Sequence, residues 1–267
     1  MILQTKRLIL RPWDVSDAEQ CYKYASDPDV GSPAGWQAHT SVQDSEMIIK
    51  SVLSKPETYA IVLKETGLPV GSIGLKFHCD LADADDECEL GYWLGKPYWG
   101  QGIVPEAAKE LIRHAFEDLN LEKIWCGFYD GNEKSKRVQE KLGFKYMWTT
   151  ENVPVIDLGE FRVGHVNCMT KKDWQIQRIN HFEGLLDQIS GAVKKLDDAL
   201  NEFKTLSPQI KELSEYYESS LWRKDFEDDE AGELPKELKR GVLSEDAVYD
   251  LLEEIKEIKE KTGCFSE

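Results

Sequence analysis

The sequence lacks the features that would place it in a membrane, in an oxidising compartment or around a metal ion. No apolar run is long enough to span a bilayer, and the opening MILQTKRLILRPW has neither the apolar segment nor the cleavage site of a signal peptide. Six cysteines are present, but they form no Cys-x-x-Cys pair and no metal-ligand spacing. We therefore expect a cytoplasmic protein that holds no metal, makes no membrane contact and keeps its thiols free. The cysteines are Cys21, Cys79, Cys88, Cys126, Cys168 and Cys264.

Positive charge is also scarce. Lys and Arg total 33 residues against 50 Asp and Glu, which gives a formal net charge of −17 at pH 7. Because nucleic-acid binding requires a basic surface that neutralises phosphates, this balance argues against nucleic acid as a partner. Hydrophobic residues make up 41% of the 267 residues, which is enough for a packed core in one large domain or two smaller ones.

The chain changes character near residue 173. Up to that point, short runs rich in β-branched and aromatic residues alternate with amphipathic helical segments. This mixture predicts an α/β (α+β) first domain around one sheet, over residues 1–173, with Asp14 as a helix N-cap. We expect strands at 7–13, 58–64, 69–77, 88–95, 123–130 and 161–170, and helices at 14–26, 104–119 and 133–143.

Residues 174–267 form a predicted second domain that is entirely helical. Apolar residues recur every three or four positions from Ile179 to Phe203, which predicts one long amphipathic helix. Pro208 suits the first turn of a second helix over 208–222, and we expect a loop over 225–235. A third helix follows Ser244 as its N-cap. The sequence thus predicts a C-terminal helical hairpin or small bundle.

The stretch YWGQGIVPEA, residues 98–107, places two glycines directly before a predicted helix. Pro105 suits the first turn of that helix, where a missing N–H costs no hydrogen bond. The first turn leaves backbone N–H groups unpaired, and Gly100 and Gly102 let the main chain curl toward an anion without a Cβ in the way. The stretch lacks the Gly-Lys-Ser/Thr ending of a Walker loop. On its own it is therefore compatible with an ordinary tight turn or with a phosphate site of another kind.

A second motif follows another predicted strand. The segment YDGNEKSKRVQEKLGF offers Asn132 and Ser135 at the head of a helix that ends at Gly143. Together with GYW at 91–93, the WGQG loop and the opening TKRLILRPW, this order of motifs resembles the GCN5-related N-acetyltransferases. Within that family it is similar to the branch of ribosomal-protein N-terminal acetyltransferases. The helical region resembles a bacterial domain family of unknown function.

The resemblance implies a mixed, largely antiparallel sheet flanked by helices, with acetyl-CoA as the cosubstrate. In the family, the amides of the glycine loop hold the pyrophosphate, and a splayed strand contacts the pantetheine through its backbone. Carried onto this sequence, the cofactor-binding residues are Trp93, Leu94, Trp99, Gly100, Gln101, Gly102, Ile103, Val104, Asn132 and Ser135.

Acetyl transfer to an amine requires a base, because an ordinary amine is mostly protonated at pH 7. Glu89 is the first candidate, directly or through water, although it could equally be a polar residue at a strand start; Glu87 is a second candidate. The N–H of Leu94 is the expected oxyanion donor. Many family members carry an acid tyrosine seven residues after the asparagine, whereas this chain has Gln139 there. Ser135 is expected either to hydrogen-bond the CoA sulfur or to cap the helix.

These observations predict an acetyl-CoA-dependent N-acetyltransferase whose acceptor is a primary amine, on a protein N-terminus or on a small molecule. The alternative is a catalytically weak CoA-binding module whose helical tail recruits a partner, and the missing acid tyrosine keeps this alternative open. The tail could serve a homodimer or another protein. His39, which lies near Trp36 in the sequence, is a candidate for the acceptor pocket.

Overall fold

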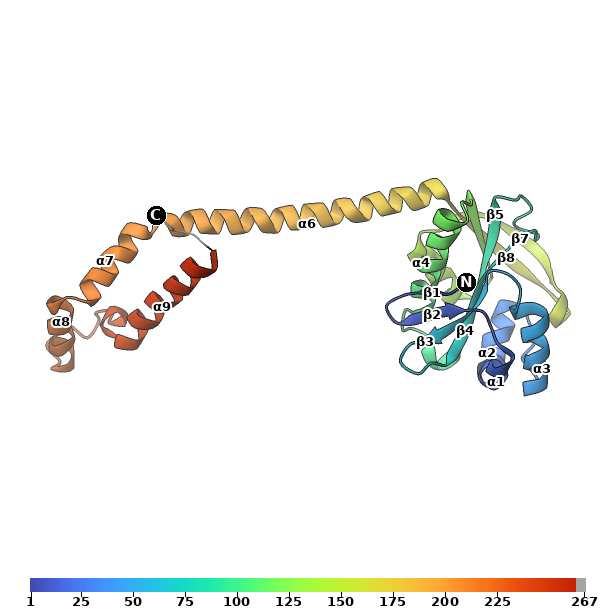
Figure 1. Ribbon diagram of the computed structural model, residues 1–267, viewed down its shortest axis with the longest axis horizontal. Coiled ribbons are helices and arrows are strands. Elements are labelled where there is room, and N and C mark those ends of the chain that lie inside the picture. Colours follow the sequence, from blue (N-terminus) through green and yellow to red (C-terminus); the bar gives the residue numbers. More distant parts are fainter. Residues whose placement is uncertain (263–267) are drawn as a thin grey trace. The chain divides into compact units, whose positions relative to one another are not determined.

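The computed structural model describes residues 1–262 (Figure 1). Its residue contacts divide the chain into two compact units, Met1–Phe182 and Glu183–Glu267. Because helix α6, Lys171–Thr205, runs through this division, the domain boundary at 173/174 stays a prediction. Cys264 lies outside the described residues; the other five cysteines are free thiols.

The first unit is built on one eight-stranded sheet of order β1-β2-β3-β4-β5-β6-β8-β7. Neighbouring strands are antiparallel, except that β5 and β6 run parallel. The prediction of a mixed, largely antiparallel sheet is therefore confirmed. The strands are β1 (Leu3–Gln4), β2 (Leu8–Arg11), β3 (Thr58–Leu63), β4 (Pro69–Lys76), β5 (Glu87–Leu94), β6 (Lys123–Tyr129), β7 (Lys145–Val155) and β8 (Glu160–Thr170).

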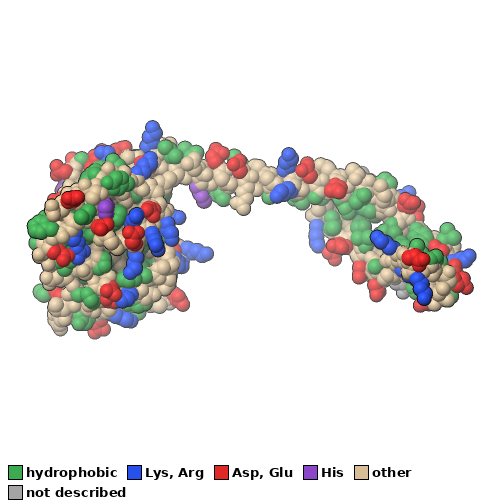
Figure 2. Space-filling view, turned by 180° about the vertical axis from the view of Figure 1, so that it is seen from behind, with side chains coloured by type: hydrophobic (Ala, Val, Ile, Leu, Met, Phe, Trp, Pro, Cys, Tyr) green, Lys and Arg blue, Asp and Glu red, His purple; other side chains and the backbone are tan. Residues whose placement is uncertain are grey.

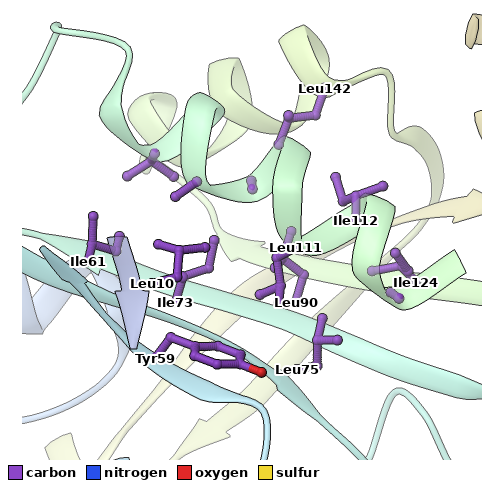
Figure 3. Packing of buried hydrophobic residues seen from close by; sticks show 14 of the residues in the cluster. Leu10, Tyr59, Ile61, Ile73, Leu75, Leu90, Leu111, Ile112, Ile124 and Leu142 are labelled. Carbon is purple, nitrogen blue, oxygen red and sulfur yellow. The ribbon is translucent and has the colours of Figure 1, made fainter. Parts of the chain in front are cut away.

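Helices cover both faces of this sheet, and an apolar cluster fills each interface. Strand β3 shows why both faces are buried, since alternate side chains point to opposite sides. Ile61 belongs to the cluster under α4, whereas Ala60 and Val62 belong to the cluster under α1. Figure 3 shows the first cluster, where strand residues pack against α4. The helices of this unit are α1 (Ala18–Ala25), α2 (Pro28–Gly31), α3 (Val42–Ile48), α4 (Ile103–Arg113) and α5 (Glu133–Leu142).

Local capping explains where these helices begin and end. Asp14 and Asp17 form a capping box at the turn that leads into α1, so the predicted N-cap is confirmed. Helix α5 begins after Asn132, whose side chain accepts the N–H of Ser135, and it ends at Gly143 in the left-handed conformation. The predicted six strands and three helices of this unit are all present.

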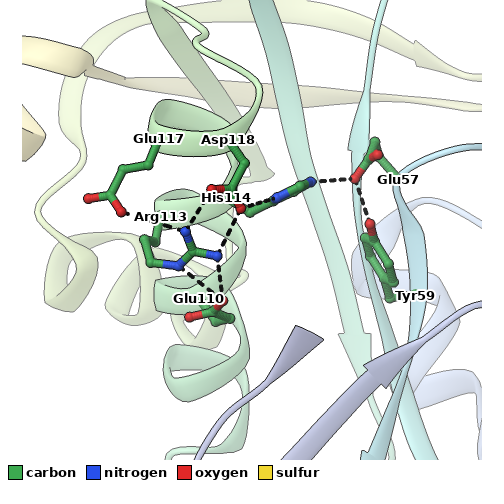
Figure 4. Close-up of polar contacts among 7 residues, drawn as sticks. All are labelled: Glu57, Tyr59, Glu110, Arg113, His114, Glu117 and Asp118. Atoms are coloured by element: carbon green, nitrogen blue, oxygen red, sulfur yellow. Dashed lines mark hydrogen bonds and ion pairs between the residues drawn. The ribbon is translucent and has the colours of Figure 1, made fainter. Parts of the chain in front are cut away.

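A polar cluster fixes the C-terminal end of α4, where the helix widens into a π-helical turn at His114–Asp118 (Figure 4). His114 is fully buried, with Nε2 3.0 Å from the Glu57 carboxylate and Nδ1 2.8 Å from that of Asp118. Arg113 pairs with Asp118 at 2.9 Å, and its hydrogen bond holds the pKa of Asp118 down at about 2, with help from His114. This cluster ties α4 to the turn before β3.

The sequence-based prediction missed strands β1 and β7 and helices α2 and α3, and it was wrong about two parts of the helical region. Strand β7 was not predicted, because its side chains are almost all exposed and its sequence has no alternation of buried and exposed residues. The helix expected over 208–222 is broken at residues 218–219, and the loop expected over 225–235 is helical as far as Glu230. Ser219 caps the new helix through a hydrogen bond to the N–H of Trp222, 3.2 Å, which the prediction missed.

The helical unit contains most of α6, α7 (Ser207–Tyr217), α8 (Ser220–Glu230) and α9 (Glu245–Thr262). Trp222 is buried and donates its indole N–H to the carbonyl of Val242, 2.7 Å. The Ser244 hydroxyl accepts the N–H of Ala247, 3.3 Å, which confirms the cap predicted there. The predicted all-α C-terminal region is therefore confirmed.

Candidate active site

A cavity opens in the first unit where strands β5 and β6 separate. The parallel pairing runs from Glu87 opposite Lys123 to Glu89 opposite Trp125. Both strands continue further, β5 to Leu94 and β6 to Tyr129. A cavity of about 1560 Å³ is lined by residues 90–94 of β5 and 126–129 of β6. The splay of two strands thus creates the space in which a ligand can contact strand backbone.

The backbone of Leu94 faces this opening. Gly95 donates its N–H to the carbonyl of Val70 on β4, 2.8 Å. Because the hydrogen bonds of an antiparallel strand alternate in direction, Leu94 directs its own N–H and carbonyl away from β4. Its carbonyl accepts the indole N–H of Trp99, 2.8 Å. The N–H of Leu94 therefore points to the β6 side, where the cavity lies.

The glycine loop forms one end of the cavity. Gly100 and Gly102 have φ of +77° and +72°, in the left-handed region that favours glycine. A Cβ on Gly100 would have no heavy atom within 4 Å, so this position faces open space. Within residues 1–262, no acceptor is found for the backbone N–H groups of residues 100–104. Unpaired donors beside open space at the N-terminus of α4 fit an anionic group such as a diphosphate.

Arg7 and Glu106 tie the glycine loop and the start of α4 to the N-terminal segment. The Arg7 guanidinium donates to the Gln101 carbonyl, 3.1 Å, and to the Glu106 carboxylate, 2.6 Å. Glu106 also accepts the Thr5 hydroxyl at 2.6 Å. Partial burial tends to raise the pKa of Glu106, but the bonds from Thr5 and Arg7 outweigh it and leave that pKa lowered. Glu106 thus anchors the start of α4 to the N-terminal segment.

The Asn132 and Ser135 side chains lie at the start of α5, on the other side of the opening. Asn132 accepts the Ser135 N–H at 3.1 Å and donates to the carbonyl of Pro33, 3.1 Å, so it is the helix cap. The Ser135 hydroxyl lies 2.9 Å from the Tyr92 hydroxyl and accepts from the Gln139 amide at 3.1 Å. Both Asn132 and Ser135 line the cavity.

The two candidate bases have different surroundings. Glu89 lines the cavity at the point where the strands separate, 3.4 Å from the Lys76 ammonium and 3.5 Å from the Cys79 thiol. Glu87 is held by the Lys123 ammonium at 2.6 Å and by the Trp125 indole N–H at 2.8 Å. The bond from Lys123 lowers the pKa of Glu87, which makes that carboxylate a poorer base.

An aromatic wall closes the far side of the cavity. The Trp93 ring stacks on Trp13 at 6.1 Å between centroids and meets Trp36 edge-on at 6.0 Å. The His39 ring lies 5.5 Å from Trp36, and its Nδ1 is 2.7 Å from the Ser45 hydroxyl. Burial lowers the pKa of His39, so the neutral imidazole is favoured there. Trp36, His39 and Trp93 all line the cavity.

The cavity brings together every predicted site residue except Gln101 and the second candidate base, Glu87. The Gln101 side chain instead donates to the carbonyl of Pro97, 2.9 Å, outside the lining. Ile103 and Val104 contribute backbone, since their side chains are buried in the core. The prediction missed Tyr92, although strand alternation places it on the opposite face from its motif neighbours and toward α5. The predicted residues in the lining are Glu89, Trp93, Leu94, Trp99, Gly100, Gly102, Ile103, Val104, Asn132 and Ser135.

The part of the chain that the structure describes shows neither a metal-binding group of side chains nor a membrane-spanning helix. Residues 1–262 contain no group of three or more His, Cys, Asp or Glu side chains placed to hold a metal ion. None of the helices described there has both the length and the apolar character needed to cross a membrane.

Two protein families match different parts of the chain. Residues 7–145 match the acetyltransferase (GNAT) domain, and residues 179–262 match a domain of unknown function, DUF4298. Among curated relatives, the uncharacterized N-acetyltransferase p20 of Bacillus licheniformis is 30% identical over 148 residues, which cover 54% of this chain and 82% of that protein. The ribosomal protein uS5-alanine N-acetyltransferase of Escherichia coli (strain K12) is 25% identical over 175 residues, which cover 63% of this chain and 78% of that protein.

Solved structures agree on the fold of the first unit. The GNAT-family acetyltransferase from Bacillus anthracis superposes with a TM-score of 0.58 at 20% identity, over 64% of this chain and 99% of that one. The ribosomal-protein-S5-alanine acetyltransferase from Vibrio fischeri gives 0.53 at 19% identity, over 65% and 98%. At such identities the likeness establishes a common fold, and the resemblance inferred from the sequence motifs is confirmed.

Proposed function

Because the chain belongs to the acetyltransferase (GNAT) family, we propose that it transfers an acetyl group from acetyl-CoA to a primary amine by direct attack in a ternary complex. The observation that carries this proposal is the cavity between β5 and β6, which gathers an anion-binding loop, backbone donors and a carboxylate in one space. Acetyl-CoA supplies the acetyl group as a thioester and leaves as a thiolate.

Different groups of the chain are assigned to different parts of acetyl-CoA. The free N–H groups of residues 100–104 receive the pyrophosphate at the positive end of α4. Trp93, Trp99, Asn132 and Ser135 line the path between that loop and the opening of β5 from β6. Gln101 takes part through its backbone, because its side chain bonds to Pro97.

Three groups are assigned to the chemistry. The Leu94 N–H, directed to the cavity, donates to the oxygen that gains negative charge during attack. Glu89, whose carboxylate lies 3.4 Å from the Lys76 ammonium, removes the proton from the amine, directly or through water. Ser135 donates a hydrogen bond to the departing sulfur, a role compatible with the capping of α5 by Asn132 rather than by Ser135.

The acceptor is a protein N-terminus or a small-molecule amine. One relative's name specifies an alanine of ribosomal protein uS5, which favours a protein N-terminus for this chain as well. The aromatic wall of Trp36 and Trp93 offers apolar surface to the group that carries the amine.

We propose that the helical unit joins a second copy of this chain. Along α6, apolar side chains recur at alternating steps of three and four and are each at least half exposed, and Figure 2 shows apolar side chains on the surface of this unit. Such a heptad stripe is the geometry of two helices that supercoil, and a second copy supplies an identical stripe. Another protein partner is the alternative. The residues of the stripe are Ile179 and Phe182, at the end of the first unit, and Leu186, Ile189, Val193 and Leu196 in the helical unit.

Calorimetry with acetyl-CoA, followed by measurement of CoA release over a panel of amines and N-terminal peptides, tests the function. Binding with acceptor-dependent release supports the transferase. Binding without release from any acceptor supports instead the catalytically weak CoA-binding module, the alternative suggested by Gln139 in the place of an acid tyrosine. Absence of binding refutes both.

A further inference from the structure

A chain of hydrogen bonds runs from the sheet to the cavity through the side chain of Gln139 on α5. The Asn167 amide on β8 donates to the Gln139 side-chain oxygen, 2.7 Å. The Gln139 side-chain nitrogen donates to the Gly127 carbonyl at 3.2 Å and to the Ser135 hydroxyl at 3.1 Å. Gln139 is fully buried and Asn167 nearly so, so this chain is part of the core that supports the cavity.

The Gly127 carbonyl fixes the donor and acceptor roles in these hydrogen bonds. The Gly127 carbonyl can only accept, so the side-chain atom of Gln139 that faces it must be the amide nitrogen. The Gln139 oxygen therefore faces Asn167, which must present its own NH₂ group. The second hydrogen of the Gln139 amide then points at Ser135, and Ser135 has to accept it.

Tyr92 completes the environment of the Ser135 hydroxyl. Its phenol oxygen lies 2.9 Å from the Ser135 hydroxyl, a contact in which either oxygen can donate, and 3.3 Å from the Ser135 carbonyl, to which only the phenol can donate; the hydroxyl contact is the shorter of the two. Burial raises the pKa of Tyr92 strongly, so the phenol keeps its proton and remains a donor. A serine hydroxyl has two lone pairs and one hydrogen. When Gln139 and Tyr92 both donate to it, both lone pairs are occupied and its hydrogen is left for the cavity.

We propose that Asn167, Gln139 and Tyr92 are positioning residues that make the Ser135 hydroxyl a hydrogen-bond donor to the sulfur of CoA. The inference rests on the proposed function. No proton is transferred in this step: the carbon–sulfur bond breaks, the sulfur keeps the electron pair, and the Ser135 hydrogen bond stabilises the resulting thiolate. The donor is thus a neutral hydroxyl whose direction is set by the buried amides.

The pKa of the thiol of bound CoA tests this proposal without any turnover. The thiolate is followed by its ultraviolet absorbance as the complex is titrated, for the wild type, Ser135→Ala, Tyr92→Phe and the double variant. We expect Ser135→Ala to raise that pKa by about one to two units, since it removes a hydrogen bond to a charged group. Tyr92→Phe raises it by a smaller amount, and it adds nothing in the Ser135→Ala background because Tyr92 acts through Ser135.

Tyr59→Phe is the matched control, since it removes a buried phenol hydroxyl that donates to the Glu57 carboxylate at 2.6 Å and does not line the cavity; it should leave the thiol pKa unchanged. Thermal melts verify that each variant is folded. The proposal is overturned if Tyr92→Phe leaves the thiol pKa at the wild-type value, or if it shifts that pKa equally with and without Ser135. Failure of CoA to bind the wild type refutes the proposed function itself, which separates the two outcomes.

Discussion

Replacing Gly100 by alanine should weaken acetyl-CoA binding far more than it weakens the fold. With φ of +77° at Gly100, an alanine is strained by about 1–2 kcal/mol, and the lower entropy of the unfolded chain offsets about 0.4–1 kcal/mol of that. The added Cβ meets no protein atom within 4 Å, so steric clash contributes nothing. The expected loss of stability is about 1 kcal/mol, or about 2–4 °C in melting temperature.

Binding responds differently, because the same Cβ occupies the open space beside the free loop amides. Displacing the diphosphate from one charge-assisted hydrogen bond costs about 1.5–3 kcal/mol. The dissociation constant measured by calorimetry should therefore rise about ten- to 150-fold.

Gly67 provides the matched control for this substitution. It lies in the turn between β3 and β4 with φ of +69°, and a Cβ there also has no heavy atom within 4 Å. Gly67→Ala should lower the melting temperature by a similar amount and leave acetyl-CoA binding unchanged. If Gly100→Ala and Gly67→Ala bind acetyl-CoA equally well, the loop does not receive the diphosphate and the reasoning is refuted.

Three other predictions test separate parts of the molecule. Glu89→Gln should lower kcat by about 10²- to 10⁴-fold with little change in the KM for acetyl-CoA, and an unchanged kcat would exclude Glu89 as the base. Asp118→Asn should lower the melting temperature at neutral pH. The pKa of the Asp118 carboxyl in the folded protein is about 2, below the ordinary value of about 4. The contribution of this carboxylate to stability is therefore complete above about pH 4 and is lost as the pH falls toward 2. A melting difference between Asp118→Asn and wild type that persists at pH 2 would contradict this. Ile189→Asp should convert a dimer into a monomer in light scattering, whereas a monomeric wild type would refute the α6 interface.

Much of the first unit could be predicted because its signals are local. Strands such as β3 are buried on both faces and read as continuous apolar runs, and Asp14, Asn132 and Gly143 mark helix ends through short-range hydrogen bonds and backbone conformation. Strand β7 was not predicted because it is an exposed edge strand with no buried face. Its sequence therefore shows no alternation of apolar and polar residues. The break between α7 and α8 depends on one cap, Ser219, within a sequence that otherwise favours continuous helix.

The site residues that belong to a local sequence motif could be predicted. Those whose position depends on residues far away in the sequence could not. The glycine loop and Asn132 follow from sequence order, but the alignment of Gln139 requires Gly127 on β6 and Asn167 on β8. Likewise, His114 is held by Glu57, a residue more than fifty positions earlier. Such contacts depend on the register of the sheet, which no local pattern specifies.

Mass spectrometry of amines and N-terminal peptides incubated with acetyl-CoA and the wild-type protein shows most directly whether this cavity supports acetyl transfer. We expect one added acetyl group on a primary amine, formed only when protein is present and greatly reduced by Glu89→Gln. If acetyl-CoA binds but no acceptor in the panel is acetylated, or if Glu89→Gln acetylates as fast as the wild type, the proposed role of this cavity in acetyl transfer is contradicted.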